Sequence, residues 1–149
     1  MSATIDEIRD DNCLVLERRL EAPPERVWAA WTTPDALGRW FGPDGTTVTT
    51  ASVDVRVGGR YRVEMQSRDG EVHCVGGSYL VVEPPARLVF TWAWASTPER
   101  ESRVTVELAA AGTGTALTLT HERFADRSAT ERHAEGWSSS FERLAAAVT

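Results

Sequence analysis

Three histidines, His73, His121 and His133, are the side chains of this sequence best suited to acid–base chemistry or to holding a polar group. In "ALTLTHE", His121 alternates with two leucines of an expected strand, which directs its imidazole toward the interior. His133 lies four residues before Trp137, one turn away on an expected helix. An imidazole in an apolar pocket can orient a polar ligand group or act as a general base. The alternative for each histidine is an ordinary hydrogen bond to the backbone or to solvent.

Large side chains on faces that are predicted to look inward could build an apolar pocket around such an imidazole. The sequence contains six tryptophans, a high number for 149 residues. The candidates for a wall suited to a flat or apolar ligand are Tyr61, Met65, Phe90, Trp92, Trp94 and Trp137. Ordinary core packing is the alternative for these side chains, and it is favoured for Phe90.

The stretch "RWFGPDG", residues 39–45, places two large aromatic residues directly before a turn. Aromatic rings usually lie in a core, whereas turns lie on the surface. The position of Trp40 and Phe41 directly before this turn therefore requires an explanation.

Other kinds of chemistry find little support in this sequence. Lysine is absent, which excludes a Schiff-base lysine, a lysine general base and a P-loop lysine. A metal site is not expected, because neither C-x-x-C nor H-x-x-x-H occurs and because the neighbours His73 and Cys74 would face opposite ways on a strand. There is no G-x-S-x-G motif, and the serines of "GWSSSF" are expected on a solvated helix face. We expect no cofactor.

The pattern of apolar residues predicts the elements that position these side chains. A first strand near residues 14–20 precedes two short helices, with Pro24 and Pro34 at their first helical positions. Alternating apolar residues then predict about six strands joined by short turns, which makes them antiparallel. A long helix is expected over about residues 128–148. It is the only expected element long enough to cover the apolar face of such a sheet.

Composition and length limit the domain organisation and the partners. The chain is predicted to form one domain over residues 12–149, and the charged residues 1–11 are expected to be a flexible tail. The net charge of −6 argues against binding to nucleic acid. Two cysteines are too few for a secreted disulfide scaffold, and neither a signal peptide nor a membrane span is recognisable. We therefore expect a soluble cytoplasmic protein that does not act at a membrane.

Several segments occur in the order seen in one known family. They are "APPERVWAAWTTPDALGRWFGPDG", "GGRYRVEM", "PPARLVFTW", "ESRVTVEL", "TALTLTHERF" and "HAEGW". Over residues 12–148 the sequence resembles the SRPBCC (START/birch-pollen-allergen-like) superfamily and, more closely, bacterial homologues of the C-terminal domain of the heat-shock-protein-90 ATPase activator. The resemblance implies an α+β helix-grip fold, with a curved antiparallel sheet of about seven strands around a long C-terminal helix and two short helices after the first strand. It also implies that Trp40 and Phe41 point inward where the second short helix ends, so that they either line the cavity or close the end of the core, while residues 43–45 make the surface turn.

The leading hypothesis is binding of an apolar or aromatic small molecule in a cavity between the sheet and the C-terminal helix, with His121 or His133 as a polar anchor. The residues expected at this site are Trp40, Phe41, Tyr61, Met65, His73, Trp92, Trp94, His121, His133 and Trp137. The resemblance implies a second hypothesis, a co-chaperone-like or stress-response module with a chaperone as partner. A third is an enzyme, such as a small cyclase, a hydrolase or a self-sacrificing resistance protein, with a histidine or Glu122 as the acid–base group. We also consider a homodimer through a strand edge or a helix.

Overall fold

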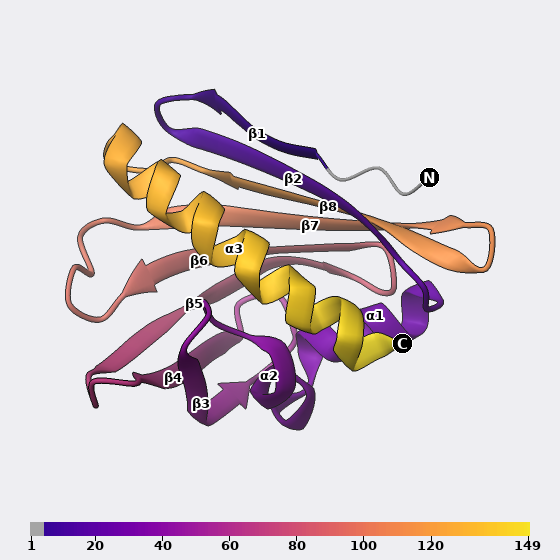
Figure 1. The fold of residues 1–149 in the computed structure, drawn as a ribbon, viewed down its shortest axis with the longest axis horizontal. Coiled ribbons are helices and arrows are strands. Elements are labelled where there is room, and N and C mark those ends of the chain that lie inside the picture. The colour runs from indigo at the N-terminus through magenta and orange to yellow at the C-terminus, as the bar shows by residue number, and fades with distance from the viewer. Residues whose placement is uncertain (1–4) are drawn as a thin grey trace.

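The computed structural model describes residues 5–149 and has an α+β architecture, in which one curved antiparallel sheet packs against a long helix (Figure 1). Within the described residues the sheet has eight strands in the order β1-β2-β8-β7-β6-β5-β4-β3. The elements are β1 (Ile5–Asp10), β2 (Cys13–Leu20), α1 (Pro24–Thr32), α2 (Pro34–Trp40), β3 (Thr46–Val53), β4 (Arg60–Ser67), β5 (Val72–Glu83), β6 (Arg87–Trp94), β7 (Ser102–Ala111), β8 (Gly114–Glu122) and α3 (Arg127–Val148). The predicted fold class is confirmed.

The long helix α3 crosses one face of the sheet diagonally, and α1 and α2 lie together near its C-terminal end (Figure 1). The helix begins at a clear cap, because the side chain of Asp126 accepts a 2.8 Å hydrogen bond from the backbone N–H of Ala129. Its apolar stripe includes Trp137, Phe141 and Leu144, all buried against the sheet. The helix itself lies where the sequence predicted it, over about residues 128–148.

Strand β1 corrects the expectation of a flexible tail over residues 1–11. Residues 5–10 form this strand and pair antiparallel with β2, and residues 1–4 lie outside the described part of the chain. The strand escaped recognition because four of its six residues are charged, as suits an edge strand. The following turn is fixed by Asn12, whose side-chain N–H donates to the carbonyl of Phe124 at 2.7 Å. The sheet therefore has eight strands rather than about seven, and the short helices follow the second strand.

The "RWFGPDG" segment ends α2 and returns the chain to the sheet. Trp40 is fully buried, its ring centroid is 4.7 Å from that of Trp31, and its Nε1–H donates to the carbonyl of Ala30 at 2.9 Å. Gly42 then adopts a φ of +105°, and a Cβ there would lie 2.6 Å from the hydroxyl of Thr46. Trp40 is thus held in the core by packing and a hydrogen bond, while the turn after it requires glycine.

Candidate functional site

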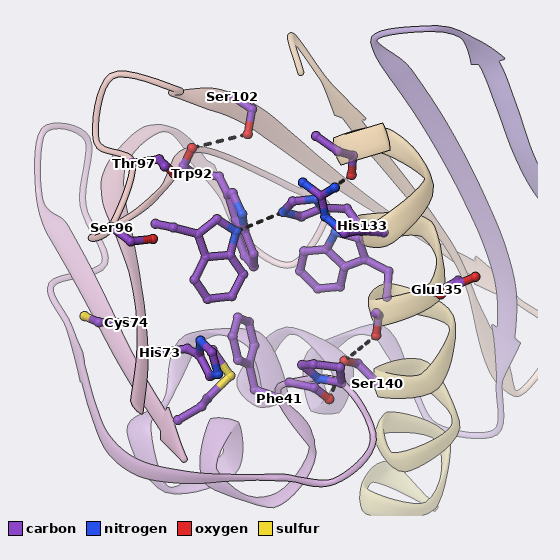
Figure 2. Close-up of a pocket in the computed structure, with 18 of the residues that line it drawn as sticks. Phe41, His73, Cys74, Trp92, Ser96, Thr97, Ser102, His133, Glu135 and Ser140 are labelled. Carbon is purple, nitrogen blue, oxygen red and sulfur yellow. Dashed lines mark hydrogen bonds between the residues drawn. The ribbon is translucent and has the colours of Figure 1, made fainter. Parts of the chain in front are cut away.

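A pocket of about 930 Å³ lies between the N-terminal half of α3 and the strands β5 and β6 (Figure 2). Its walls come from the loop after α2, the start of β5, the end of β6 with the loop that follows, and one face of α3. Segments far apart in the sequence therefore meet around one space. Pockets that bind small molecules typically measure about 300–1,000 Å³, so this one has room for such a ligand.

Aromatic rings from three different elements form the deep wall of the pocket. Trp92 on β6 lies 5.1 Å from Trp137 on α3, measured between ring centroids. Phe41 lies 5.9 Å from Trp92 and 6.0 Å from Trp137, nearly perpendicular to the latter. Trp94 stands at 90° to Trp92, and Met65 contributes a flexible thioether nearby. The wall is apolar and built from interlocking rings.

The structure brings together most of the residues that the sequence predicted for this site. Those that line the pocket are Phe41, Met65, His73, Trp92, Trp94, His133 and Trp137. Three predicted residues do not line it, namely Trp40, Tyr61 and His121. Trp40 packs in the core, and the hydroxyl of Tyr61 donates to the carbonyl of Thr91 at 2.6 Å. Tyr61 instead borders a separate space of about 20 Å³ among core side chains.

His121 lies behind the pocket wall and is fully buried. The indole N–H of Trp137 donates to its Nδ1 at 3.0 Å, and its Nε2 lies 2.7 Å from the hydroxyl of Ser102. Because an indole nitrogen can only donate, Nδ1 must be the unprotonated nitrogen, and Nε2–H therefore donates to Ser102. Ser102 in turn donates to the carbonyl of Trp92 at 3.2 Å. Burial, with a smaller effect of the nearby His133, lowers the pKa of His121 well below 6.5.

The proton on Nε2 decides what the Ser102–His121 pair can do. A serine nucleophile needs a base nitrogen that can accept its hydroxyl proton. Here the nitrogen that faces Ser102 already carries a proton, so His121 cannot act as the general base for this hydroxyl. The pair is a structural hydrogen bond, and the histidine-base version of the enzyme hypothesis loses its candidate at position 121.

His133 has the opposite tautomer. Its Nδ1 lies 2.7 Å from the carbonyl of Ala129, which can only accept, so Nδ1 carries the proton. Its Nε2 accepts a hydrogen bond from the indole N–H of Trp94 at 3.0 Å (Figure 2). Burial lowers the pKa of His133 below 6.5. Both ring nitrogens are used, so His133 contributes a neutral ring face rather than a free polar anchor.

Within residues 5–149 the buried indole N–H of Trp92, in the deep wall, has no hydrogen-bond partner, and further polar side chains lie at the mouth of the pocket. His73 is half-buried on β5, and its Nε2 lies 3.8 Å from a carboxylate oxygen of Glu71. In Figure 2 His73 points toward the pocket, whereas the sulfur of Cys74 and the carboxylate of Glu135 point away from it. This agrees with the prediction that His73 and Cys74 face opposite ways. Arg100, paired with Asp126 at 3.6 Å, also belongs to the mouth.

Two consecutive serines of α3 fasten the loop after α2 against the helix. Ser140 donates to the carbonyl of Gly42 at 2.7 Å, and Ser139 accepts from the backbone N–H of Asp44 at 2.6 Å. The expectation of a solvated helix face is therefore wrong for Ser140, which is buried. No local pattern indicated this role, since serines that face solvent and serines that bind a loop occur in the same sequence context. Ser102 was missed for the same reason.

Residues 5–149 contain neither a metal site nor a membrane-spanning helix. No group of three or more histidine, cysteine, aspartate or glutamate side chains there could hold a metal ion. Cys13 and Cys74 are free thiols, and burial, as the largest effect, raises the pKa of Cys13. In the same range no helix is long and apolar enough to cross a membrane.

Comparison with protein families identifies the relatives of this fold. The model described as activator of Hsp90 ATPase homolog 1-like protein matches residues 21–149. The chain belongs to this family. The match contains α1, α2, most of the sheet and the whole of α3, and it confirms the resemblance drawn from the sequence motifs. No curated protein matches the chain.

Solved structures of this family's type extend the comparison. Protein CV1439 from Chromobacterium violaceum is 35% identical, with a TM-score of 0.81 over 92% of this chain and 97% of its own. The AHSA1 protein SPO3351 from Silicibacter pomeroyi is 33% identical, with a TM-score of 0.79 over 90% of this chain and 95% of its own. CalU16 from Micromonospora echinospora is 25% identical, with a TM-score of 0.71 over 100% of this chain and 85% of its own.

Proposed function

We propose that the protein binds a small, flat and largely apolar molecule in the pocket between α3 and the strands β5 and β6. The observation that carries this proposal is the pocket itself, about 930 Å³ of space beside closely packed aromatic rings. Protein interiors are normally filled to the density of organic crystals. A space of this size next to Trp92, Trp94 and Trp137 is the arrangement that pockets for aromatic ligands share.

The polar groups of the pocket support a neutral ligand body. The indole N–H groups of Trp94 and Trp137 donate to His133 and His121. The hydroxyl of Ser102 accepts from His121 and donates to the carbonyl of Trp92. A charged ligand group buried at this depth would find no free partner among these groups and would lose its hydration. A polar substituent fits better at the mouth, near His73 and Glu71.

The family match supports a second candidate, an interaction with a chaperone of the Hsp90 type. Such an interaction needs an exposed apolar surface. Within residues 5–149 the exposed large hydrophobic side chains are Val57, Val72 and Leu80, which belong to the β3–β4 loop and to β5. Only Val72 borders the pocket. These side chains give the chaperone candidate weaker support than the pocket gives ligand binding.

Titration with N-phenyl-1-naphthylamine tests the proposal. This neutral aromatic dye fluoresces strongly in apolar surroundings, and we expect saturable binding of one molecule per chain. Trp94→Ala should raise the dissociation constant about tenfold, or about 1.4 kcal/mol, because the ring borders the pocket. Trp28→Ala is the matched control, since Trp28 is a half-buried α1 residue outside the pocket, and it should change the constant by less than about twofold.

Two outcomes would contradict ligand binding at this site. The first is the absence of saturable dye binding to the folded wild-type protein. The second is equal weakening by Trp94→Ala and Trp28→Ala. Stimulation of the ATPase rate of the host's Hsp90-type chaperone, without dye binding, would favour the second candidate.

A further inference from the structure

We propose that His133 is a positioning residue of the pocket, which holds the Trp94 indole in place as part of the wall and releases it when the imidazole gains a proton. This inference rests on the proposed function, because it assigns a role to a residue of the same pocket. It also changes the expectation from the sequence. His133 acts on the ligand through Trp94 rather than as a polar anchor.

The Trp94–His133 hydrogen bond joins the sheet to the helix across the pocket. Trp94 is the last residue of β6, and His133 lies in the second turn of α3, so the bond links two elements that are far apart in the sequence. Nε1 of Trp94 and Nε2 of His133 are 3.0 Å apart (Figure 2). A half-buried indole at a strand end has several accessible rotamers, and a hydrogen bond across the space selects one of them.

The same bond depends on the protonation state of His133. In the neutral ring, Nδ1–H donates to the carbonyl of Ala129 and Nε2 accepts from Trp94. Addition of a proton turns Nε2 into a donor that faces the indole N–H, another donor. The Ala129 bond survives this change, whereas the Trp94 bond does not. The protonated state therefore keeps the imidazole attached to the helix and leaves the indole without its partner.

Packing indicates which of the two rings moves. The His133 ring lies 4.8 Å from that of Phe124 and 5.3 Å from that of His121, measured between centroids, and Trp92 lies 6.1 Å away. These contacts and the Ala129 bond hold the imidazole on several sides. Trp94, which is half-buried like His133, has ring contacts with Trp92 at 5.6 Å and His73 at 6.5 Å, and its indole N–H donates to His133. Loss of the bond therefore displaces the indole, and the wall that a flat ligand contacts becomes less ordered.

The charged and titratable groups around His133 favour its neutral form near neutral pH. On α3 the residue directly before His133 is Arg132, and His121 faces the imidazole from β8. At the mouth, Arg100 from the β6–β7 loop is paired with Asp126, and His73 from β5 faces Trp94 at 6.5 Å. Burial lowers the pKa of His133, the carbonyl of Ala129 opposes this, and Arg132 lowers it further. Release of Trp94 is therefore expected on the acid side of the ordinary histidine range.

The variant His133→Gln separates positioning from a merely structural role. The side-chain oxygen of glutamine can take the place of Nε2 and accept from Trp94, but it does not titrate. The affinity for N-phenyl-1-naphthylamine is measured for each variant at several values between about pH 8 and about pH 5, where histidine changes charge. The wild-type dissociation constant should rise about tenfold toward acid pH. With His133→Gln it should stay within about twofold of the wild-type neutral value over the whole range.

His73→Gln is the matched control, because it removes the other histidine that lines the pocket and should leave the pH dependence as in the wild type. A second readout does not need the dye. In ¹⁵N–¹H spectra the indole N–H signal of Trp94, assigned by its loss in Trp94→Phe, should shift on acidification in the wild type and not in His133→Gln. An identical pH dependence of dye binding in the wild type and His133→Gln would overturn the inference and leave the proposed function intact. If the dye fails to bind at any pH, the proposed function fails, and the spectra alone decide the role of His133.

Discussion

His121→Phe is the substitution that most directly tests the hydrogen bonds behind the pocket wall. His121 is fully buried, accepts from the indole N–H of Trp137 and donates to the hydroxyl of Ser102. Its ring also packs on Phe124 with centroids 4.1 Å apart. Phenylalanine keeps a ring of similar size at this position. The substitution therefore removes both hydrogen bonds while preserving most of the packing.

The expected loss of stability follows from what each partner retains. Ser102 still donates to the carbonyl of Trp92, so the loss of the imidazole donor costs about 1 kcal/mol there. The indole N–H of Trp137 has no other hydrogen-bond partner within residues 5–149 and becomes a buried unsatisfied donor, which costs about 1–3 kcal/mol. The sum is about 2–4 kcal/mol. For a chain of this length that corresponds to a decrease in melting temperature of about 5–15 °C.

Urea denaturation near neutral pH, followed by tryptophan fluorescence, measures this loss. His73→Phe is the matched control, because His73 is half-exposed and its replacement should change the free energy of unfolding by less than about 0.5 kcal/mol. The double variant His121→Phe/Trp137→Phe should lose about 1–2 kcal/mol less than the sum of the single losses, because neither partner then remains unsatisfied. A loss below about 0.5 kcal/mol for His121→Phe would refute the argument.

Two further predictions concern pH and the middle of α3. The free energy of unfolding should fall as the pH drops below about 6.5, because the folded protein lowers the pKa of His121 and His133 and so binds fewer protons than the unfolded chain in this range. Urea denaturation at several pH values should show this decrease. The prediction would be contradicted if the free energy of unfolding of His121→Phe/His133→Gln depended on pH in the same way as that of the wild type. Gly136→Ala should raise the free energy of unfolding by up to about 1 kcal/mol, because alanine favours the helix over glycine and the added methyl group meets only Pro43, at 3.9 Å. A thermal melt measures this as a higher melting temperature. A lower melting temperature would contradict the prediction and show that the space in front of Gly136 is needed for folding.

The sequence predicted the fold well where one face of an element is apolar. The strand in "GGRYRVEM" places Tyr61, Val63 and Met65 on the buried face, as its alternation requires. Strand β5 also comes close to β6, since a Cβ on Gly77 would lie 2.1 Å from the carbonyl of Thr91. Strand β1 was missed because its charged composition hides a pairing that depends on β2.

The site was predictable in composition and less so in arrangement. Alternation along β6 placed Trp92 and Trp94 toward the interior, and both line the pocket. Alternation also placed His121 inward, but it could not show that Trp137 and Ser102 take both of its nitrogens. Whether an inward ring reaches a pocket or stops in the core depends on how far helix and sheet stand apart. The sequence of a single element does not show that distance. It therefore could not indicate that Phe41 lines the pocket whereas Trp40 packs in the core.

The separation between α3 and the sheet explains why a pocket persists beside so many large rings. The backbone of α3 comes nearest to β1, β2, α1 and α2. Its N-terminal end is bonded to the β1–β2 turn through Thr130 and the carbonyl of Asp11, and Phe141 and Leu144 of its C-terminal half belong to the core. Over β5 and β6 the N-terminal half faces the sheet across a wider gap, which only long aromatic side chains can span. Indoles free to rotate could collapse into that gap. The bonds from Trp94 to His133 and from Trp137 to His121 oppose this collapse, because turning either indole away breaks its bond, and the buried N–H of Trp137 would be left unsatisfied at a cost of about 1–3 kcal/mol. The two histidines therefore keep the pocket open by holding its walls.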